Sequence, residues 1–106
     1  MKFLVGFLML IAWNQANAAT LLNCNVSDGA DQQVMVIETN GNLTLRELTM
    51  GGRWIERALT AKEWSSKKIL LHSAPGEKTI FAKVGSEWTF HVTGPGYDSY
   101  GYADCF

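Results

Sequence analysis

The residues best suited to bind a partner lie in one glycine-rich segment near the end of the chain. The run GPGYDSYGY, from Gly94 to Tyr102, carries three tyrosines and one aspartate. Tyrosines in such a segment offer rigid, amphipathic contact area to a protein, and they also stack on sugar rings. Tyr97, Asp98, Tyr100 and Tyr102 are therefore predicted binding residues for an envelope protein or a cell-wall glycan. The alternative is that Tyr100 and Tyr102, two positions apart, share the inner face of a strand and complete the core.

Trp64 is the fifth predicted binding residue. It stands in the polar segment Glu63 to Lys68, which offers it no evident core face. We expect this side chain to be exposed or to cap one end of the domain.

Catalytic and metal-binding patterns are missing from the sequence. The two histidines, His72 and His91, stand in predicted strands, and no Gly-x-Ser-x-Gly elbow accompanies them. They are expected on solvated strand faces. The carboxylates are scattered singly, and two cysteines with two distant histidines lack the ligand spacing of a zinc site. The sequence therefore predicts no catalytic residue, no metal ligand and no cofactor.

The first eighteen residues have the pattern of a cleavable export signal. Lys2 is followed by an apolar run from Phe3 to Trp13, and Ala16-Asn17-Ala18 has the small-x-small form of a cleavage site. An apolar run of eleven residues is too short for a membrane-spanning helix. We therefore expect a signal at 1–18, a single β domain at 19–106, a periplasmic or secreted location, and no membrane association after cleavage.

The net charge of the predicted mature chain argues against nucleic acid as a partner. Removal of Lys2 leaves eight Lys and Arg against ten Asp and Glu, a net charge of about −2. No basic field is available to attract phosphates.

The two cysteines are predicted to form one disulfide. Asn23 precedes Cys24, whereas a bacterial lipidation site requires a small residue there, and lipidation would leave Cys105 as an odd thiol. An exported chain with two cysteines permits a single pairing, Cys24 with Cys105. This bond places the first and last strands side by side and favours a closed or nearly closed sheet.

Eight short strands separated by turn signals are predicted along the mature part. Asn40-Gly41 marks a hairpin over about 32–49, and the final strand runs from Tyr97 to Phe106. Thr60 and Glu63 match a capping box, which predicts a short helical connector at 60–66. The expected fold is all-β: a small antiparallel eight-stranded meander that forms a closed or nearly closed barrel.

In strand number and in a disulfide that joins early and late segments, the predicted fold is similar to that of small exported bacterial lysozyme inhibitors. Their Ser-Gly-x-x-Tyr type of loop is not present here, since the glycine-rich stretches Met50 to Arg53 and Gly94 to Gly96 do not match it. The resemblance therefore concerns architecture.

Three functions follow as hypotheses. The first is an exported, non-enzymatic and inhibitor-like binding module that presents the tyrosine segment to an envelope protein or glycan. The second is a small barrel that holds an apolar ligand, as lipocalin-like folds do. The third is an envelope hydrolase, which would require a pocket with two carboxylates about 5–9.5 Å apart.

Overall fold

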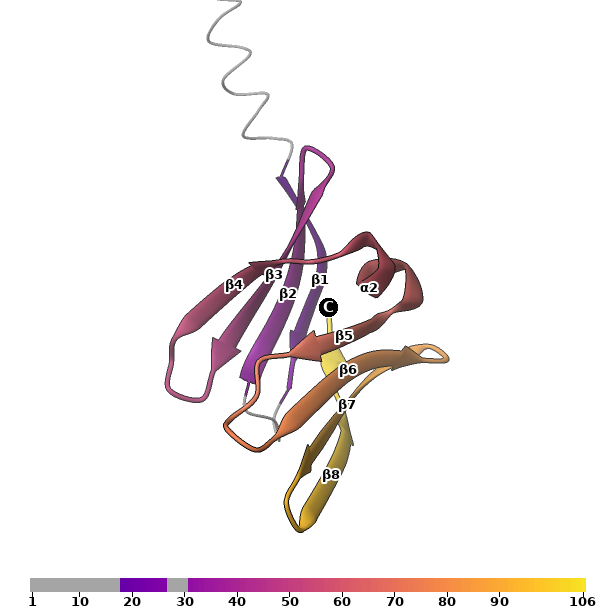
Figure 1. Ribbon diagram of the computed structural model, residues 1–106. Coiled ribbons are helices and arrows are strands. Elements are labelled where there is room, and N and C mark those ends of the chain that lie inside the picture. The colour runs from indigo at the N-terminus through magenta and orange to yellow at the C-terminus, as the bar shows by residue number, and fades with distance from the viewer. Residues whose placement is uncertain (1–17, 27–30) are drawn as a thin grey trace, which may run out of the picture.

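The computed structural model describes residues 18–26 and 31–106, which form two antiparallel sheets and one short helix (Figure 1). The elements are β1 (Ala18–Asn25), β2 (Asp31–Thr39), β3 (Asn42–Thr49), β4 (Trp54–Ala58), α2 (Ala61–Ser66), β5 (Lys68–Leu71), β6 (Lys78–Val84), β7 (Glu87–Gly94), β8 (Tyr97–Tyr102) and β9 (Asp104–Cys105). The predicted export signal lies outside the described residues except for Ala18, the first residue of β1.

Sequential hairpins build both sheets. One sheet has the strand order β4-β3-β2-β1-β9, and the other has the order β5-β6-β7-β8. The predicted hairpin at Asn40-Gly41 is confirmed: φ is 52° at Asn40 and 83° at Gly41, as expected for the tight turn that joins twisted strands. The predicted meander is therefore correct for the strands from β1 to β8.

The last predicted strand is divided into two. β8 pairs with β7, whereas β9 pairs with β1 through Cys24 opposite Cys105 and Asn25 opposite Asp104. Ala103 lies between β8 and β9, and its N–H donates to the carbonyl of Trp88 at 2.9 Å. The chain thus passes from one sheet to the other at Ala103, and the structure contains nine strands in its described part instead of eight.

The predicted disulfide fixes this crossing. Cys24 and Cys105 are bonded, with their Cα atoms 4.0 Å apart. A disulfide indicates a non-reducing compartment. Within the part of the chain that the structure describes, no helix is long and apolar enough to cross a membrane.

The short helix forms the other connection between the sheets. Thr60 Oγ1 accepts from the N–H of Glu63 at 3.1 Å, and Glu63 Oε1 accepts from the N–H of Thr60 at 3.3 Å, so the capping box is confirmed. The helix ends at Lys67, which has a left-handed φ of 54°. β4 and β5, on either side of α2, share no backbone ladder. β8 and β9 share no ladder either, so the barrel is nearly closed, with a seam between β4 and β5 and an unpaired edge at β8.

Large side chains fill the space between the sheets. Phe81, Phe90, Leu45 and Ile69 are almost completely buried. Phe81 stacks on Trp88, with ring centroids 4.8 Å apart. Gly101 makes room for the Phe90 ring, since a Cβ atom at Gly101 would lie 2.7 Å from it.

Candidate functional site

The outer face of the four-stranded sheet carries a row of side chains that crosses all its strands. Leu70 pairs with Ile80, Ile80 with His91, and His91 with Tyr100. Alternate residues of a strand point to opposite faces, so these four share the face that lies away from the core. Leu70 is 49% exposed and Tyr100 is 58% exposed.

A second row lies beside the first. It joins Lys68, Ala82, Thr89 and Tyr102 across the same four strands. Val84, the last residue of β6, lies on the same face, and its side chain is exposed. We define the outer sheet face by the uncharged members of this region and by His91: Leu70, Ile80, Ala82, Val84, Thr89, His91, Tyr100 and Tyr102. An exposed apolar and aromatic patch with charged residues around it is typical of a protein interaction surface.

Tyr100 and Tyr102 share one face of β8, as their spacing predicts, and that face is the solvent side. Tyr102 is 64% exposed. The core-facing neighbours on β8 are Ser99 and Gly101, which pair with Val92 and Phe90. The alternative that the two tyrosines complete the core is therefore wrong, because β8 gives its inner positions to small residues.

The aromatic rings of this face lie at an angle to one another. The His91 Nε2 atom contacts the Asp98 carboxylate. The His91 and Tyr100 rings are 6.0 Å apart and inclined by 68°, and the Tyr100 and Tyr102 rings are 6.1 Å apart and inclined by 77°. The rings form an uneven surface instead of a flat platform.

Tyr97, predicted as part of the same site, lies apart from the other tyrosines. It pairs with Gly94 at the end of the β7–β8 hairpin, and its ring covers Gly94, where a Cβ atom would lie 2.5 Å from the ring. The Glu77 carboxylate raises the pKa of the Tyr97 phenol by accepting its hydroxyl hydrogen. Tyr97 thus points to the opposite face from Tyr100.

Trp64 is also separate from the tyrosines. Its half-buried ring lies 6.4 Å from that of Trp88, and the Lys67 ammonium lies 3.2 Å from its centroid. Trp64 covers one end of the core, which is the capping role expected from the sequence. Of the five predicted binding residues, the structure brings together Asp98, Tyr100 and Tyr102.

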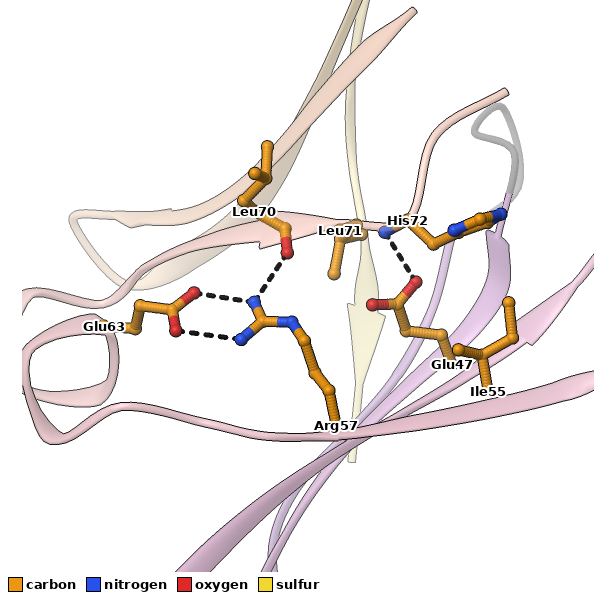
Figure 2. A pocket seen from close by; sticks show the side chains of 7 residues that line it. All are labelled: Glu47, Ile55, Arg57, Glu63, Leu70, Leu71 and His72. Carbon is orange, nitrogen blue, oxygen red and sulfur yellow. Dashed lines mark hydrogen bonds and ion pairs between the residues drawn. The ribbon is translucent and has the colours of Figure 1, made fainter. Parts of the chain in front are cut away.

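A pocket of about 390 Å³ opens at the seam between β4 and β5 (Figure 2). Its walls contain both charged and apolar side chains: Glu47, Ile55, Arg57, Glu63, Leu70, Leu71 and His72. No sequence pattern identified this group, because its members belong to separate elements that no local signal relates.

Arg57 bridges the seam. Its guanidinium donates to both carboxylate oxygens of Glu63, at 3.0 and 2.7 Å, and to the carbonyl of Leu70 at 2.8 Å (Figure 2). The Arg57 pair lowers the pKa of the Glu63 carboxyl to about 2. Arg57 on β4 thus connects this strand to β5, in place of the backbone hydrogen bonds that the two strands do not share.

Glu47 makes the second bridge. Its carboxylate accepts from the N–H of His72 at 2.8 Å, just beyond the end of β5 (Figure 2).

Burial and the neighbouring Glu47 raise the pKa of Asp31 to about 9, and Asp31 is only 1% exposed. Asp31 is therefore protonated at neutral pH, because burial and the charge of Glu47 both disfavour its ionised form.

Replacing Asp31 with Asn is expected to stabilise the protein at alkaline pH. The folded chain keeps the Asp31 proton up to about pH 9, whereas the unfolded chain releases it near the ordinary aspartate pKa of 3.8. The folded state therefore loses stability from this group as the pH rises from about 4 to 9. An Asn side chain is neutral without binding a proton, so we expect Asp31→Asn to add about 2 kcal/mol to the free energy of unfolding at pH 8.

Urea denaturation of both proteins at pH 4 and pH 8 measures this difference. At pH 4 the two should be equally stable within about 0.5 kcal/mol, because this pH is close to the aspartate pKa of 3.8 in the unfolded chain, so folding requires little extra proton binding. An equal effect at both pH values would refute the assignment of the proton to Asp31.

The pocket does not provide the chemistry of a paired-carboxylate hydrolase. Glu47 and Glu63 both line it. However, Glu63 is ionised and held by Arg57, and Glu47 is occupied by the backbone of His72. The residue that holds a proton, Asp31, is buried away from the surface. Among the described residues, these carboxyl groups stabilise the seam and do not provide a general acid.

Comparison with other proteins adds no family to these observations. No protein-family model matches the chain, and no curated protein and no solved structure matches it. Within residues 18–26 and 31–106, no group of three His, Cys, Asp or Glu side chains is arranged to hold a metal ion. The fold and the outer sheet face therefore define a small disulfide-bonded β domain with an exposed aromatic surface.

Proposed function

We propose that this chain is an exported binding module that holds a protein partner on the outer sheet face, in the periplasm or outside the cell. The observation that carries the proposal is the exposure of Leu70, Val84, Tyr100 and Tyr102 on one face of the same sheet. Burial of such a surface by a partner would release water from apolar groups, and tyrosine is common at the centre of protein interfaces.

The ring geometry favours a protein partner over a glycan. A sugar polymer is best held by aromatic rings that lie in one plane, whereas Tyr100 and Tyr102 are inclined by 77°. Such an arrangement offers one ring face and one ring edge, which suit the uneven side chains of a protein. The neighbouring Leu70 and Ile80 extend the surface with aliphatic groups that have no role in sugar stacking.

The predicted signal at 1–18 and the disulfide support export. A single disulfide is consistent with both the periplasm and the extracellular space.

A filled interior weakens the alternative of an apolar ligand inside the barrel. Phe81 and Phe90 are almost completely buried, and Trp88 is stacked on Phe81. An interior of this size holds either side chains or one small ligand, and here side chains occupy it.

Replacing Tyr100 and Tyr102 together with Ala is expected to weaken partner capture at least about 30-fold, because loss of two central aromatic contacts commonly costs about 2 kcal/mol or more. The measurement is quantitative capture from an envelope extract, with circular dichroism to establish folding. Tyr97→Ala is the matched control, since Tyr97 is 45% exposed but lies on the other face. Unchanged capture by a folded double variant, or an equal loss in Tyr97→Ala, would overturn the proposal.

A further inference from the structure

β8 is the outermost strand of the four-stranded sheet, and its far side has no neighbour (Figure 1). An edge strand presents a line of backbone N–H and C=O groups that can pair with another chain. Within the described residues, neither a backbone group nor a side chain bonds to this side of β8 from Tyr97 to Tyr102.

The hairpin register shows which groups face outward. Gly94 and Tyr97 close the two-residue Pro95-Gly96 turn, so they form a hydrogen-bonded pair, and such pairs alternate with pairs whose backbone groups point away from the partner strand. The residues that direct both N–H and C=O outward are therefore Asp98, Tyr100 and Tyr102. Their side chains also stand on the outer face, so the free backbone edge and the exposed aromatic surface adjoin each other.

The opposite edge of the same sheet is protected. The carbonyl of Leu70, on the outer side of β5, accepts a hydrogen bond from Arg57. The N–H of His72, one residue after the end of β5, donates to Glu47. Side chains thus satisfy the backbone at that edge. β8 contains no Pro, no Lys and no bulge in its pairing with β7, and its one charged residue is Asp98.

The two strands nearest the free edge, β7 and β8, carry acidic residues and no Lys or Arg. Residues 84–106 contain three acids, Glu87, Asp98 and Asp104, and no Lys or Arg. Among the described residues, Glu87 at the start of β7 and Tyr102 at the end of β8 line a small pocket of about 190 Å³. A carboxylate beside an aromatic ring suits a Lys or Arg side chain, whose stem lies on the ring and whose charge meets the carboxylate.

We infer that β8 binds an extended, positively charged segment of the protein partner, which adds as a fifth strand to the sheet and places a Lys or Arg side chain in the Glu87–Tyr102 pocket. This inference rests on the proposed function, because it specifies how the partner approaches the same surface. Backbone hydrogen bonds to Asp98, Tyr100 and Tyr102 provide affinity, and the acidic residues select a basic sequence.

The same charges disfavour a second copy of this chain as the occupant. Pairing β8 with β8 of another copy would bring together two strands that carry Asp98 and no Lys or Arg, and like charges in close proximity oppose association.

The test uses a phage-displayed library of random twelve-residue peptides, selected on the disulfide-bonded protein. We expect the enriched peptides to carry Lys or Arg among alternating β-branched or aromatic residues and to lack Pro. Their affinities are then measured against a matched pair of variants, Tyr100→Val and Tyr100→Pro. Both variants lose the phenol ring, but only Pro removes the outward N–H, and it breaks no bond to β7 because Tyr100 lies in a non-hydrogen-bonded pair.

The inference predicts that the peptides bind Tyr100→Pro at least tenfold more weakly than Tyr100→Val, and that Glu87→Gln removes the selection for Lys or Arg. Equal affinity for the two Tyr100 variants would refute strand addition, as would a selection that yields no peptides or peptides without basic residues. In each of these cases the proposed function is still decided separately by capture with the Tyr100 and Tyr102 double variant. Thermal unfolding of Tyr100→Pro establishes that the variant is folded.

Discussion

Removal of the Cys24–Cys105 disulfide is expected to lower the free energy of unfolding by about 4.5 kcal/mol. The two cysteines are 81 residues apart in sequence, so the bond closes a loop that contains nearly all of the folded domain. Without it the unfolded chain gains the conformational freedom of that whole loop. A loss of this size is comparable to the total stability of many small domains.

The native contacts of β9 cannot compensate for the lost bond. β9 pairs with β1 at two positions, and one further bond joins the N–H of Phe106 to the carbonyl of Asn23 at 2.9 Å. We therefore expect β9 to separate from β1 in the reduced protein.

Urea denaturation of the Cys24→Ala, Cys105→Ala double variant measures this effect, and the wild-type protein in dithiothreitol is the matched control. Both should show the same midpoint, because Ala fills most of the buried Cys24 position. A loss below about 1 kcal/mol in both would contradict the loop-closure argument.

Replacing Arg57 with Met is expected to lower the free energy of unfolding by about 2 kcal/mol, from the ion pair with Glu63 and the hydrogen bond to Leu70 together. Met keeps the apolar stem of the side chain but removes the donors that bind Glu63 and the Leu70 carbonyl. Glu63 then lies without its counter-ion, and β5 loses its contact with β4. Arg57→Lys is the matched control, since it keeps the positive charge but cannot bind both Glu63 oxygens and Leu70 together.

The acid dependence of stability provides a second measurement of the same interaction. The pKa of Glu63 is lowered from 4.5 to about 2 by Arg57, so the pair stabilises the folded state above pH 4.5, and this stabilisation is lost as the pH falls toward 2. Because the Arg57 side chain is 38% exposed, solvent screens the pair, and we expect it to contribute about 1 kcal/mol. Between pH 4.5 and pH 2, the free energy of unfolding of Arg57→Met should therefore change much less than that of the wild-type protein. An unaltered dependence on pH would exclude the Arg57–Glu63 pair as the source of this change.

Several features of the fold follow from local sequence signals. Asn40-Gly41 formed the predicted hairpin, and Thr60 with Glu63 formed the predicted capping box. These predictions were correct because a positive φ at Asn-Gly and a side-chain cap at a helix start depend on residues close in sequence. The Cys24–Cys105 pairing was equally accessible, since two cysteines leave a single choice.

The division of the last strand was not predictable in the same way. The run from Tyr97 to Phe106 has no Pro at its centre, and local preference favours a continuous strand. The chain leaves β7 at Ala103 because Cys105 must reach Cys24 on β1, which belongs to the other sheet.

The tyrosine segment was predictable only in part. Its residue types indicated binding, and alternation placed Tyr100 and Tyr102 on one face. Which face was inward depended on the neighbouring strand: the Phe90 ring occupies the space at Gly101, so the core has no room for a larger side chain at that position of β8. Tyr97 lies on the other face of β8, because alternate residues of a strand point to opposite faces.

The sequence by itself thus determined the strand positions, the turns, the helix cap and the disulfide, because each depends on neighbouring residues or on a single possible pairing. Only the tertiary structure decided that Leu70, Ile80, His91 and Tyr100 form one row and that Arg57 crosses the seam to Glu63 and Leu70. The physical reason is that strand register and sheet packing bring together residues far apart in the chain, and each local pattern is compatible with many such arrangements.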